Sequence, residues 1–278
     1  MQLIIQPDAG VTPIVKAIKK AKKTIDVVIF RFDRTEIERA LESAVERDVV
    51  VRALIAHTNR GGEKSLRKLE MRLLECGVVV ARTADDLPRY HGKMMIVDGA
   101  ALHVYGFNLT RQDIDNSRSF GIVTRNKKLL QEAARLFEAD TLRQAYTPGN
   151  PRIVVSPENS RKVLTDFVKG AKKQLLIYDQ QISDNLIQRV LTERAKAGVE
   201  IRILGKLEKT IQKVKVRKLA DLRLHVRAIV RDGADAFVGS QSLRKLELDG
   251  RREIGVIIKD GVVVKKIRSV FEADWKLS

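Results

Sequence analysis

The sequence predicts an α/β protein made of two tandem repeats, each a mixed sheet flanked by helices, packed about a pseudo-twofold axis. Three observations indicate this fold class. Strand-like and amphipathic helix-like segments alternate in both halves of the chain. Blocks of sequence from the first half recur in the second. A polar motif centred on a histidine lies at the matched position in each half. We place the repeats at residues 1–147 and 148–278, joined by "YTPGNP", which has the Pro and Gly of a linker.

The internal repeat is visible at two offsets. "AKKTIDVVIF" at 21–30 corresponds to "AKKQLLIYDQ" at 171–180, an offset of 150 residues. "RSFGIV" at 118–123 corresponds to "REIGVI" at 252–257, an offset of 134. The second copy is therefore 16 residues shorter, and we expect the loss in the connection equivalent to 55–90.

The elements of the first repeat follow from local patterns. Apolar residues at helical spacing predict three helices, at 11–23, 34–48 and 65–77, and Gly77 is a typical residue for a helix end. Apolar runs predict strands at 24–32 and 49–56, of the kind buried in a parallel sheet. Two further strands, "KMMIVDG" and "ALHVYGF", are expected to pair across a glycine-containing turn, and a helix at 127–145 closes the repeat.

Composition narrows the class of partner. The chain has 53 Lys and Arg against 35 Asp and Glu, a formal net charge of +18, which favours a polyanion: nucleic acid or an anionic lipid surface. One cysteine, Cys76, excludes a disulfide framework and a cysteine-rich metal site. There is no apolar run of the roughly 18 residues that span a bilayer, and the first residues do not resemble a signal peptide. We therefore expect a cytoplasmic protein.

The motif that carries chemistry is "RYHGKMMIVDG" at 89–99. Its histidine, lysine and aspartate recur in "LHVRAIVRDG" with the same spacing and with arginine for lysine. The two sets are His91, Lys93 and Asp98, and His225, Arg227 and Asp232. Downstream, "YGFNLT" against "VGSQSL" aligns Asn108 with Gln241, allowing a one-residue difference in the turn. Polar features at matched positions in two diverged copies indicate a shared site rather than core packing. The remaining histidines, His57 and His103, match no motif, and we expect them in loop and filling positions.

The geometry of a strand brings these groups together. His91 and Lys93 are two residues apart, so on a strand both side chains leave the same face of the sheet. A pseudo-twofold axis would then bring two imidazoles and two cations to one cleft. That set suits a phosphodiester, because cations neutralise the non-bridging oxygens, one imidazole can attack phosphorus and the other can protonate the leaving oxygen.

The two motifs and the duplication resemble the paired HKD motifs of the phospholipase D superfamily. That superfamily includes phospholipases D, cardiolipin and phosphatidylserine synthases, metal-independent endonucleases and tyrosyl-DNA phosphodiesterases. The resemblance implies a two-step phosphohistidine mechanism with no metal and no cofactor. It implies that His91 and His225 supply nucleophile and acid, and that Lys93, Arg227, Asn108 and, as a weaker match, Gln241 bind phosphate. It implies structural roles for Asp98 and Asp232.

The resemblance also implies a partner for each histidine. Family members commonly place a carboxylate about 28 residues after the motif histidine, to hydrogen-bond its other ring nitrogen. Glu253 fits this position for His225, and the first copy has Ser119 there, beside the phosphate site. A carboxylate favours the imidazolium form, which suits an acid, and a hydroxyl leaves imidazole neutral, which suits a nucleophile. The hypothesis is that His91 attacks and His225 protonates the leaving group.

Three functions remain open for a monomer with both motifs in one chain. Aromatic residues make up 5% of the chain, which slightly favours a nucleic acid backbone over acyl chains as substrate. The basic run at 206–218 is either a surface for a phosphate backbone or headgroups, or a solvated helix face. The first alternative is a phosphatidyltransferase acting on anionic phospholipid, with peripheral membrane contact. The second is an inactive polyanion-binding module. Arg227, Gln241 and Ser119 favour this alternative, because they depart from the family pattern.

Overall fold

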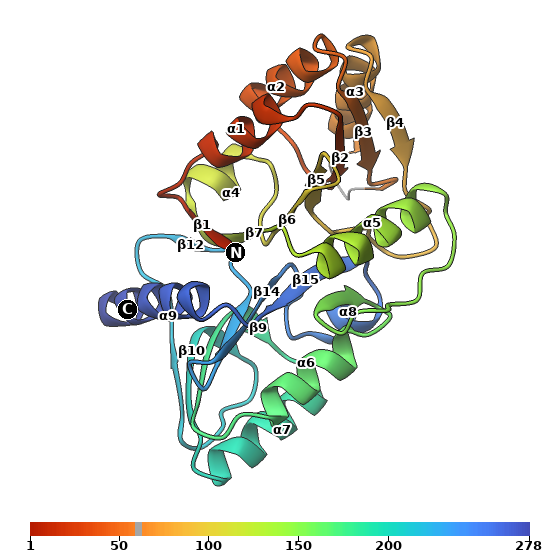
Figure 1. The fold of residues 1–278 in the computed structure, drawn as a ribbon. Helices are drawn as coiled ribbons and strands as arrows, with labels where there is room; N and C mark the ends of the chain where they lie inside the picture. Colours follow the sequence, from red (N-terminus) through yellow and green to blue (C-terminus); the bar gives the residue numbers. More distant parts are fainter. Residues whose placement is uncertain (59–62) are drawn as a thin grey trace.

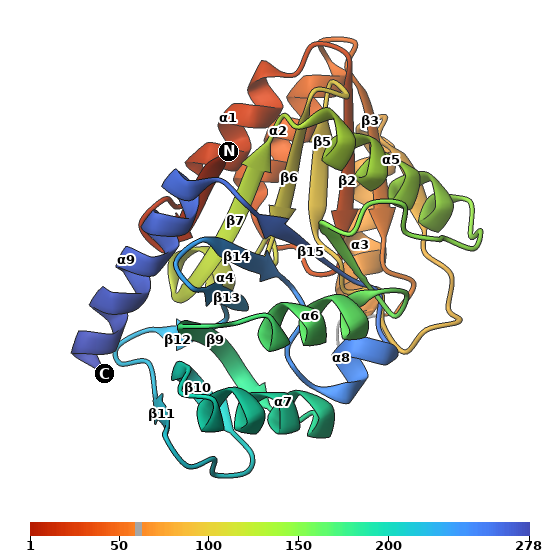
Figure 2. The same cartoon turned by 60° about the horizontal axis from the view of Figure 1, so that its bottom comes forward.

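The computed structural model describes residues 1–58 and 63–278 and contains two α/β units, one above the other in Figure 1 and again distinct in Figure 2. Each unit has one mixed sheet with helices against it, so the predicted fold class is confirmed. Residues 142–152 form neither helix nor strand. We propose the boundary between the repeats within this segment, at residues 147 and 148.

The two sheets have the same strand order, which confirms the duplication. The first runs β1-β7-β6-β5-β2-β3-β4 and the second β8-β15-β14-β13-β9-β10-β11. The strands of the first repeat are β1 (Gln2–Gln6), β2 (Thr24–Ile29), β3 (Val50–Ile55), β4 (Val79–Arg82), β5 (Met94–Val97), β6 (Ala101–Tyr105) and β7 (Ser117–Thr124). Those of the second are β8 (Ile153–Ser156), β9 (Gln174–Ile182), β10 (Glu200–Leu207), β11 (Val214–Arg217), β12 (Arg223–Leu224), β13 (Ala228–Arg231), β14 (Asp235–Gly239) and β15 (Glu253–Ile258).

The helices cover both sheets and the junction between them. They are α1 (Thr12–Lys20), α2 (Thr35–Val45), α3 (Glu63–Glu75), α4 (Arg111–Asp115), α5 (Lys127–Thr141), α6 (Ser160–Lys169), α7 (Asn185–Lys196), α8 (Lys245–Asp249) and α9 (Gly261–Leu277). One core lies between the first sheet and α1–α3, and another between the second sheet and α6 and α7. A third core joins the inner faces of both sheets with α5 and α9, at opposite sides of the junction (Figure 1). None of the described helices is long and apolar enough to cross a membrane.

The missing residues of the second repeat lie where the sequence predicts. Helix α3 stands between β3 and β4, whereas their counterparts β10 and β11 are joined by residues 208–213 alone. The basic run at 206–218 is therefore not a helix face. It comprises the end of β10, the connection and β11, which is an edge strand of the second sheet.

The two repeats exchange backbone hydrogen bonds immediately before their motifs. Strand β12 pairs with β7 of the first repeat, and the N–H of His225 donates to the carbonyl of Arg118 at 3.1 Å. Reciprocally, Tyr90 forms a bridge with Arg252, and the N–H of His91 donates to the carbonyl of Arg252 at 2.7 Å. Each motif histidine is thus held against a strand of the other repeat, and this exchange positions the candidate site.

Candidate active site

A cavity of about 300 Å³ lies at the junction of the repeats, with both motif histidines in its wall. The other lining residues are Phe30, Arg31, Asp33, Arg89, Asn108, Thr110, Gln112, Asp113 and Arg223. His91 and His225 are 8% and 5% exposed, so their rings are buried apart from the edge that faces the cavity. The structure therefore brings the two imidazoles and Asn108 together at one cavity, although His91 and His225 are 134 positions apart in the sequence.

The motif residues lie just before their strands rather than on them. Strand β5 begins at Met94 and β13 at Ala228, so each cation directly precedes its strand and each histidine lies two residues before the cation. The expectation that each His and its cation are strand residues is wrong. The reason is the exchange described above, which draws the backbone of His91 and His225 to the other repeat. Lys93 still reaches its histidine, with Nζ 2.8 Å from Nε2 and 2.9 Å from Nδ1 of His91.

The partner of His91 is Glu253, not Ser119. Nδ1 of His91 lies 2.8 and 2.9 Å from the two carboxylate oxygens of Glu253, which is fully buried on β15. Ser119 instead places its Oγ 3.5 Å from Nδ1 of His225. The pairing within each copy that the sequence predicts is wrong, because Glu253 adjoins Arg252 and Ser119 adjoins Arg118, the residues that bind the opposite motif.

These contacts specify the tautomer of His91. A carboxylate accepts hydrogen bonds and an ammonium only donates them, so Nδ1 carries the proton toward Glu253 and Nε2 presents its lone pair. Burial, and then the charge of Lys93, hold the pKa of His91 well below its ordinary value. His91 is therefore a neutral imidazole with Nε2 available as a nucleophile. The sequence argument, in which a hydroxyl partner keeps His91 neutral, does not apply, and the roles of the two histidines stay a prediction.

His225 has a different environment. Its Nε2 lies 3.5 Å from Oδ2 of Asp113, a buried residue of α4 that the motifs do not include. Burial and the charge of Arg227 hold the pKa of His225 well below its ordinary value, and the charge of Asp113 opposes them without outweighing them. "TRQD" could have pointed to Asp113, because Thr–x–x–acid is typical of a helix start, and Oγ1 of Thr110 does accept from the N–H of Asp113. That pattern predicts the helix but not its contact with the opposite motif.

Asp113 also binds the predicted phosphate ligand of the first repeat. Asn108 donates to Oδ2 of Asp113 from its backbone N–H at 2.8 Å and from Nδ2 at 2.6 Å. On the other carboxylate oxygen, Arg223 donates from the second repeat at 2.6 Å. Burial raises the pKa of Asp113, but these donors and His225 outweigh it, so the pKa lies below the ordinary value. Asp113 is thus an anion that connects Asn108, Arg223 and His225.

The two motif cations are buried at the site. Burial lowers the pKa of Lys93 to about 7, opposed by the Glu253 carboxylate, which raises it. Arg227 donates to the carbonyl of His225 at 2.7 Å and to Oε1 of Gln180 at 2.8 Å, so its guanidinium is fixed in orientation. Both cations lower the pKa of both histidines, which places their charge close to each ring.

Gln241 lies elsewhere, because its alignment with Asn108 is wrong by one residue. Gly239 pairs with Gly255 as Tyr105 pairs with Gly121, so the offset of 134 continues and Ser242 takes the place of Asn108. Gln241 is buried beneath the sheet, where its Nε2 donates to the carbonyl of Val154 at 2.9 Å. A Cβ on Gly239 would lie 2.5 Å from Oε1 of Gln241. Gln241 therefore packs over that glycine and does not line the cavity.

The motif aspartates lie away from the cavity, at matched turns. Asp98, with a φ of 53°, accepts from the backbone N–H groups of 22–24 through its carboxylate. Asp232, with a φ of 54°, does the same for 172–174. Each ties the turn after the motif strand to the start of the neighbouring antiparallel strand, β2 or β9. We propose that this structural role is the reason for the shared aspartate.

Replacing Glu253 with Gln is expected to lower turnover by about ten- to a hundredfold, because the amide still accepts from Nδ1 but cannot balance positive charge on the ring. Burial raises the pKa of Glu253 to about 7, so the carboxylate is protonated, and the rate of the unsubstituted protein falls, as the pH drops below that value. The rate measured from pH 5 to 8 should show this acidic limb, and the Gln variant should lack it. An unchanged limb in the variant would assign it to another group.

The chain is similar to known proteins over both repeats. The family described as "Cardiolipin synthase, PLD-like domain" matches residues 14–141 and 164–275, which is most of both repeats. No curated protein matches the sequence. The polyphosphate kinase of Porphyromonas gingivalis superposes with a TM-score of 0.81 at 17% identity, over 99% of this chain and 50% of the kinase, so this chain spans half of its length.

Two further solved structures are similar. The phosphatidylserine synthase of Haemophilus influenzae has a TM-score of 0.72 at 11% identity, over 99% of this chain and 86% of that one. Nuc, a phospholipase D family member of Salmonella typhimurium, aligns over 52% of this chain and 95% of Nuc, at 23% identity and a TM-score of 0.47. The kinase and the synthase share the fold of both repeats.

Proposed function

The chain belongs to the phospholipase D superfamily, and from this premise we propose that it cleaves or transfers a phosphodiester through a phosphohistidine on His91, with a nucleic acid backbone as substrate. The observation that carries the proposal is the cavity in which both motif histidines meet. The proton on Nδ1 of His91, held by Glu253 from the other repeat, leaves the lone pair on Nε2, which can attack once Lys93 turns from it.

In the first step, the lone pair on Nε2 of His91 forms a bond to phosphorus, and the bond from phosphorus to the leaving oxygen breaks. His225 donates the proton that this oxygen needs. The pKa of His225 lies well below its ordinary value without substrate, and the negative charge of a bound phosphodiester would raise it, as that of Asp113 does, toward the protonated form required of an acid. Lys93 and the Nδ2 of Asn108 lie near enough to donate to the non-bridging oxygens once they turn from His91 and Asp113.

In the second step, water or an alcohol gives a proton to His225 as its oxygen attacks phosphorus. The bond between phosphorus and Nε2 then breaks, and its electron pair returns to His91. The phosphorylated imidazole carries positive charge, which the buried Glu253 carboxylate balances through Nδ1. The nucleophile and the acid therefore have distinct supports, a carboxylate for one and a hydroxyl for the other.

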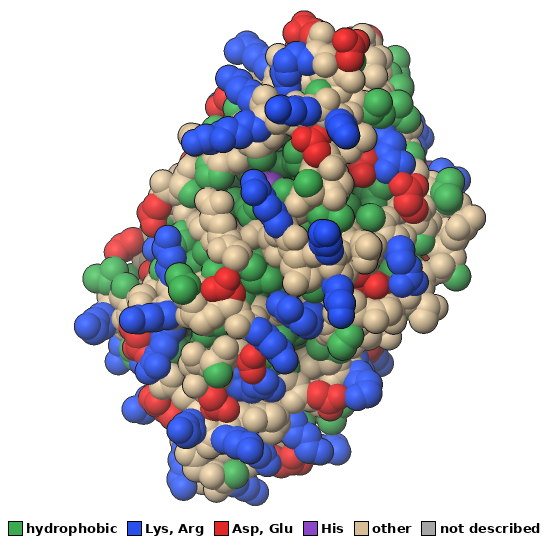
Figure 3. Space-filling view, viewed as in Figure 1, with side chains coloured by type: hydrophobic (Ala, Val, Ile, Leu, Met, Phe, Trp, Pro, Cys, Tyr) green, Lys and Arg blue, Asp and Glu red, His purple; other side chains and the backbone are tan. Residues whose placement is uncertain are grey.

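The surroundings of the cavity favour nucleic acid as the substrate. Three arginines, Arg31, Arg89 and Arg223, line it, and among its described lining residues Phe30 is the single hydrophobic one. Lys and Arg side chains are spread over the face in Figure 3, in keeping with the net charge of +18. Such a surface binds a phosphate backbone through many weak contacts that salt screens. Acyl chains would need an apolar entrance.

Phosphatidyl transfer is the second candidate, favoured by the description of the matching family as a cardiolipin synthase. To separate the two, single-stranded DNA, RNA and phosphatidylglycerol vesicles are each incubated with the protein in EDTA, with a His91→Ala variant alongside. Cleavage of DNA or RNA that the variant lacks supports the proposal. Turnover of the vesicles alone would establish the second candidate, and no turnover of any substrate would favour a binding module.

A further inference from the structure

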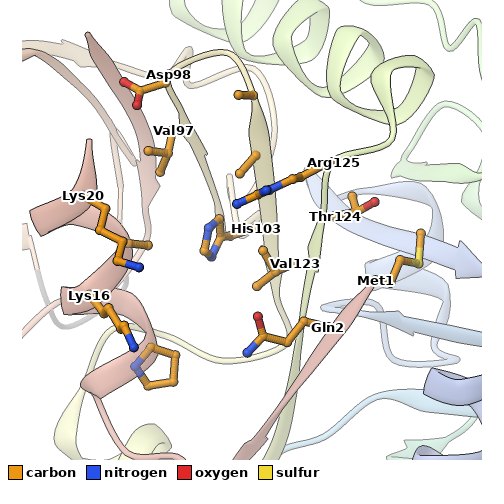
Figure 4. A pocket seen from close by; sticks show the side chains of 14 residues that line it. Met1, Gln2, Lys16, Lys20, Val97, Asp98, His103, Val123, Thr124 and Arg125 are labelled. Atoms are coloured by element: carbon orange, nitrogen blue, oxygen red, sulfur yellow. The ribbon is translucent and has the colours of Figure 1, made fainter. Parts of the chain in front are cut away.

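A second and larger cavity lies at the other end of the strands of the first sheet, between α1 and strands β5, β6 and β7. Its volume is about 690 Å³, within the range of small-molecule sites, and it shares no lining residue with the site of the two motif histidines. Its floor is aliphatic, and His103 of β6 stands in the centre of it (Figure 4). The floor includes Pro13, Ala17, Val97, Ala101 and Val123.

The internal duplication allows the lining of this cavity to be compared with the equivalent region of the second repeat. At the offsets of 150 and 134, the second repeat has Phe167 where the first has Ala17, and Phe237 where it has His103. Phe167 and Phe237 are buried in the core of their repeat, and the guanidinium of Arg231 lies over the Phe167 ring at 4.4 Å. The second repeat thus places two aromatic rings in this region, and its corresponding cavity, of about 590 Å³, has Phe167 in place of Ala17 and Asp166 in place of Lys16.

Three cations surround the cavity. Lys16 and Lys20 face it from α1, and Arg125 extends toward it from the opposite wall, near the ring of His103 (Figure 4). Among the described residues, these three side chains have no acidic partner, and the one carboxylate in the lining, Asp98, accepts from the backbone N–H groups of 22–24. Lys16 and Lys20 are one helical turn apart, where like charges destabilise a helix. An anion between the two walls would relieve this repulsion.

His103 provides a polar group inside the cavity. It is 4% exposed, and its Nδ1 has no hydrogen-bond partner in the described part of the chain, which is costly for a buried nitrogen. Burial lowers the pKa of His103 to about 4, so the ring is neutral and adds no charge to the three cations. A neutral imidazole can contact either the head or the body of a ligand. The filling role expected from the sequence does not explain a histidine that leaves space around it.

We infer that this cavity of the first repeat binds a small organic anion, with a phosphate or carboxylate head held by Lys16, Lys20 and Arg125 and an alkyl body on the aliphatic floor. The charge of the walls selects the head. The described lining has no Phe, Tyr or Trp ring, and the imidazole of His103 is the one aromatic ring on which a base could stack, which favours an alkyl body over a nucleoside. The site lies apart from the proposed chemistry and does not depend on it.

The test is calorimetric titration of the full chain with hexyl phosphate, hexanoate, inorganic phosphate and AMP. Hexyl phosphate or hexanoate should bind saturably, and inorganic phosphate at least about tenfold more weakly, since each buried CH₂ group contributes about fourfold. Whichever of hexyl phosphate and hexanoate binds more tightly identifies the head group as a phosphate or a carboxylate. Tighter binding of AMP would overturn the alkyl assignment, and no saturable binding of either alkyl anion would overturn the site.

Variants locate the binding. Ala17→Phe introduces the residue of the second repeat and should reduce affinity for the alkyl anion at least about tenfold, as should the surface double variant Lys20→Gln with Arg125→Gln. Lys169→Gln with Lys196→Gln removes the same charge from α6 and α7 and should leave affinity unchanged. His91→Ala should also bind normally. Equal losses in the control pair, or loss in His91→Ala, would contradict a site beside His103. Thermal unfolding by circular dichroism checks that each variant is folded.

Discussion

A His91→Ala variant is expected to lose about 10²- to 10⁴-fold in turnover, and the unsubstituted protein to carry a covalent phosphate on His91 during the reaction. The reason is the tautomer: Glu253 holds the proton on Nδ1, so Nε2 has the lone pair that a bond to phosphorus requires once Lys93 turns from it. The measurement is an alkaline quench during turnover of a labelled substrate, followed by peptide mapping, because phosphohistidine survives base better than acid.

A matched control is His57→Ala, which removes a partly exposed histidine that lies outside the cavity wall. Its turnover should equal that of the unsubstituted protein. Label on the peptide that contains His225 would reverse the two roles. In that case, the hydroxyl of Ser119 would support the nucleophile and the carboxylate of Glu253 would support the acid.

The repeat architecture could be predicted because each helix and strand has a characteristic spacing of apolar residues within a short segment. Helix α1 and strand β2 have apolar residues at periods that a single sequence displays, and their counterparts repeat them. The motif histidines could be found because matched polar residues in two diverged copies have no packing explanation. Both inferences need only residues close together in the chain, or a fixed offset between copies.

The partner of each histidine could not be predicted in the same way. The choice between Glu253 and Ser119 depends on β12 joining the sheet of the first repeat and on Tyr90 bridging to Arg252, contacts between segments more than a hundred residues apart. Offsets within a copy cannot show an exchange between copies. Asp113 was missed for the same reason, since its contacts with His225 and Arg223 cross the junction. The residues that tune the site come from the opposite repeat.

A His225→Ala variant is expected to lose more turnover the more basic the leaving group is, because a basic leaving group needs a proton in order to depart. With an alkoxide leaving group, as in a nucleic acid backbone, the loss should reach about 10²- to 10⁴-fold, because no other group supplies the proton. With a p-nitrophenyl phosphodiester, whose phenolate departs without a proton, the loss in the first step should be less than about tenfold. Single-turnover rates of label transfer to the protein, on both substrates, make the comparison.

The same pair of substrates separates an acid from a residue that only shapes the cavity. His91→Ala should lose both reactions equally, since no leaving group can replace the nucleophile, whereas His225→Ala should lose one far more than the other. Equal losses in His225→Ala would mean that it positions the substrate or supports Asp113 rather than donating a proton. If His91→Ala instead lost much more turnover with the alkoxide leaving group than with p-nitrophenolate, His91 would be the acid. The leaving-group dependence therefore assigns the two roles independently of the covalent label.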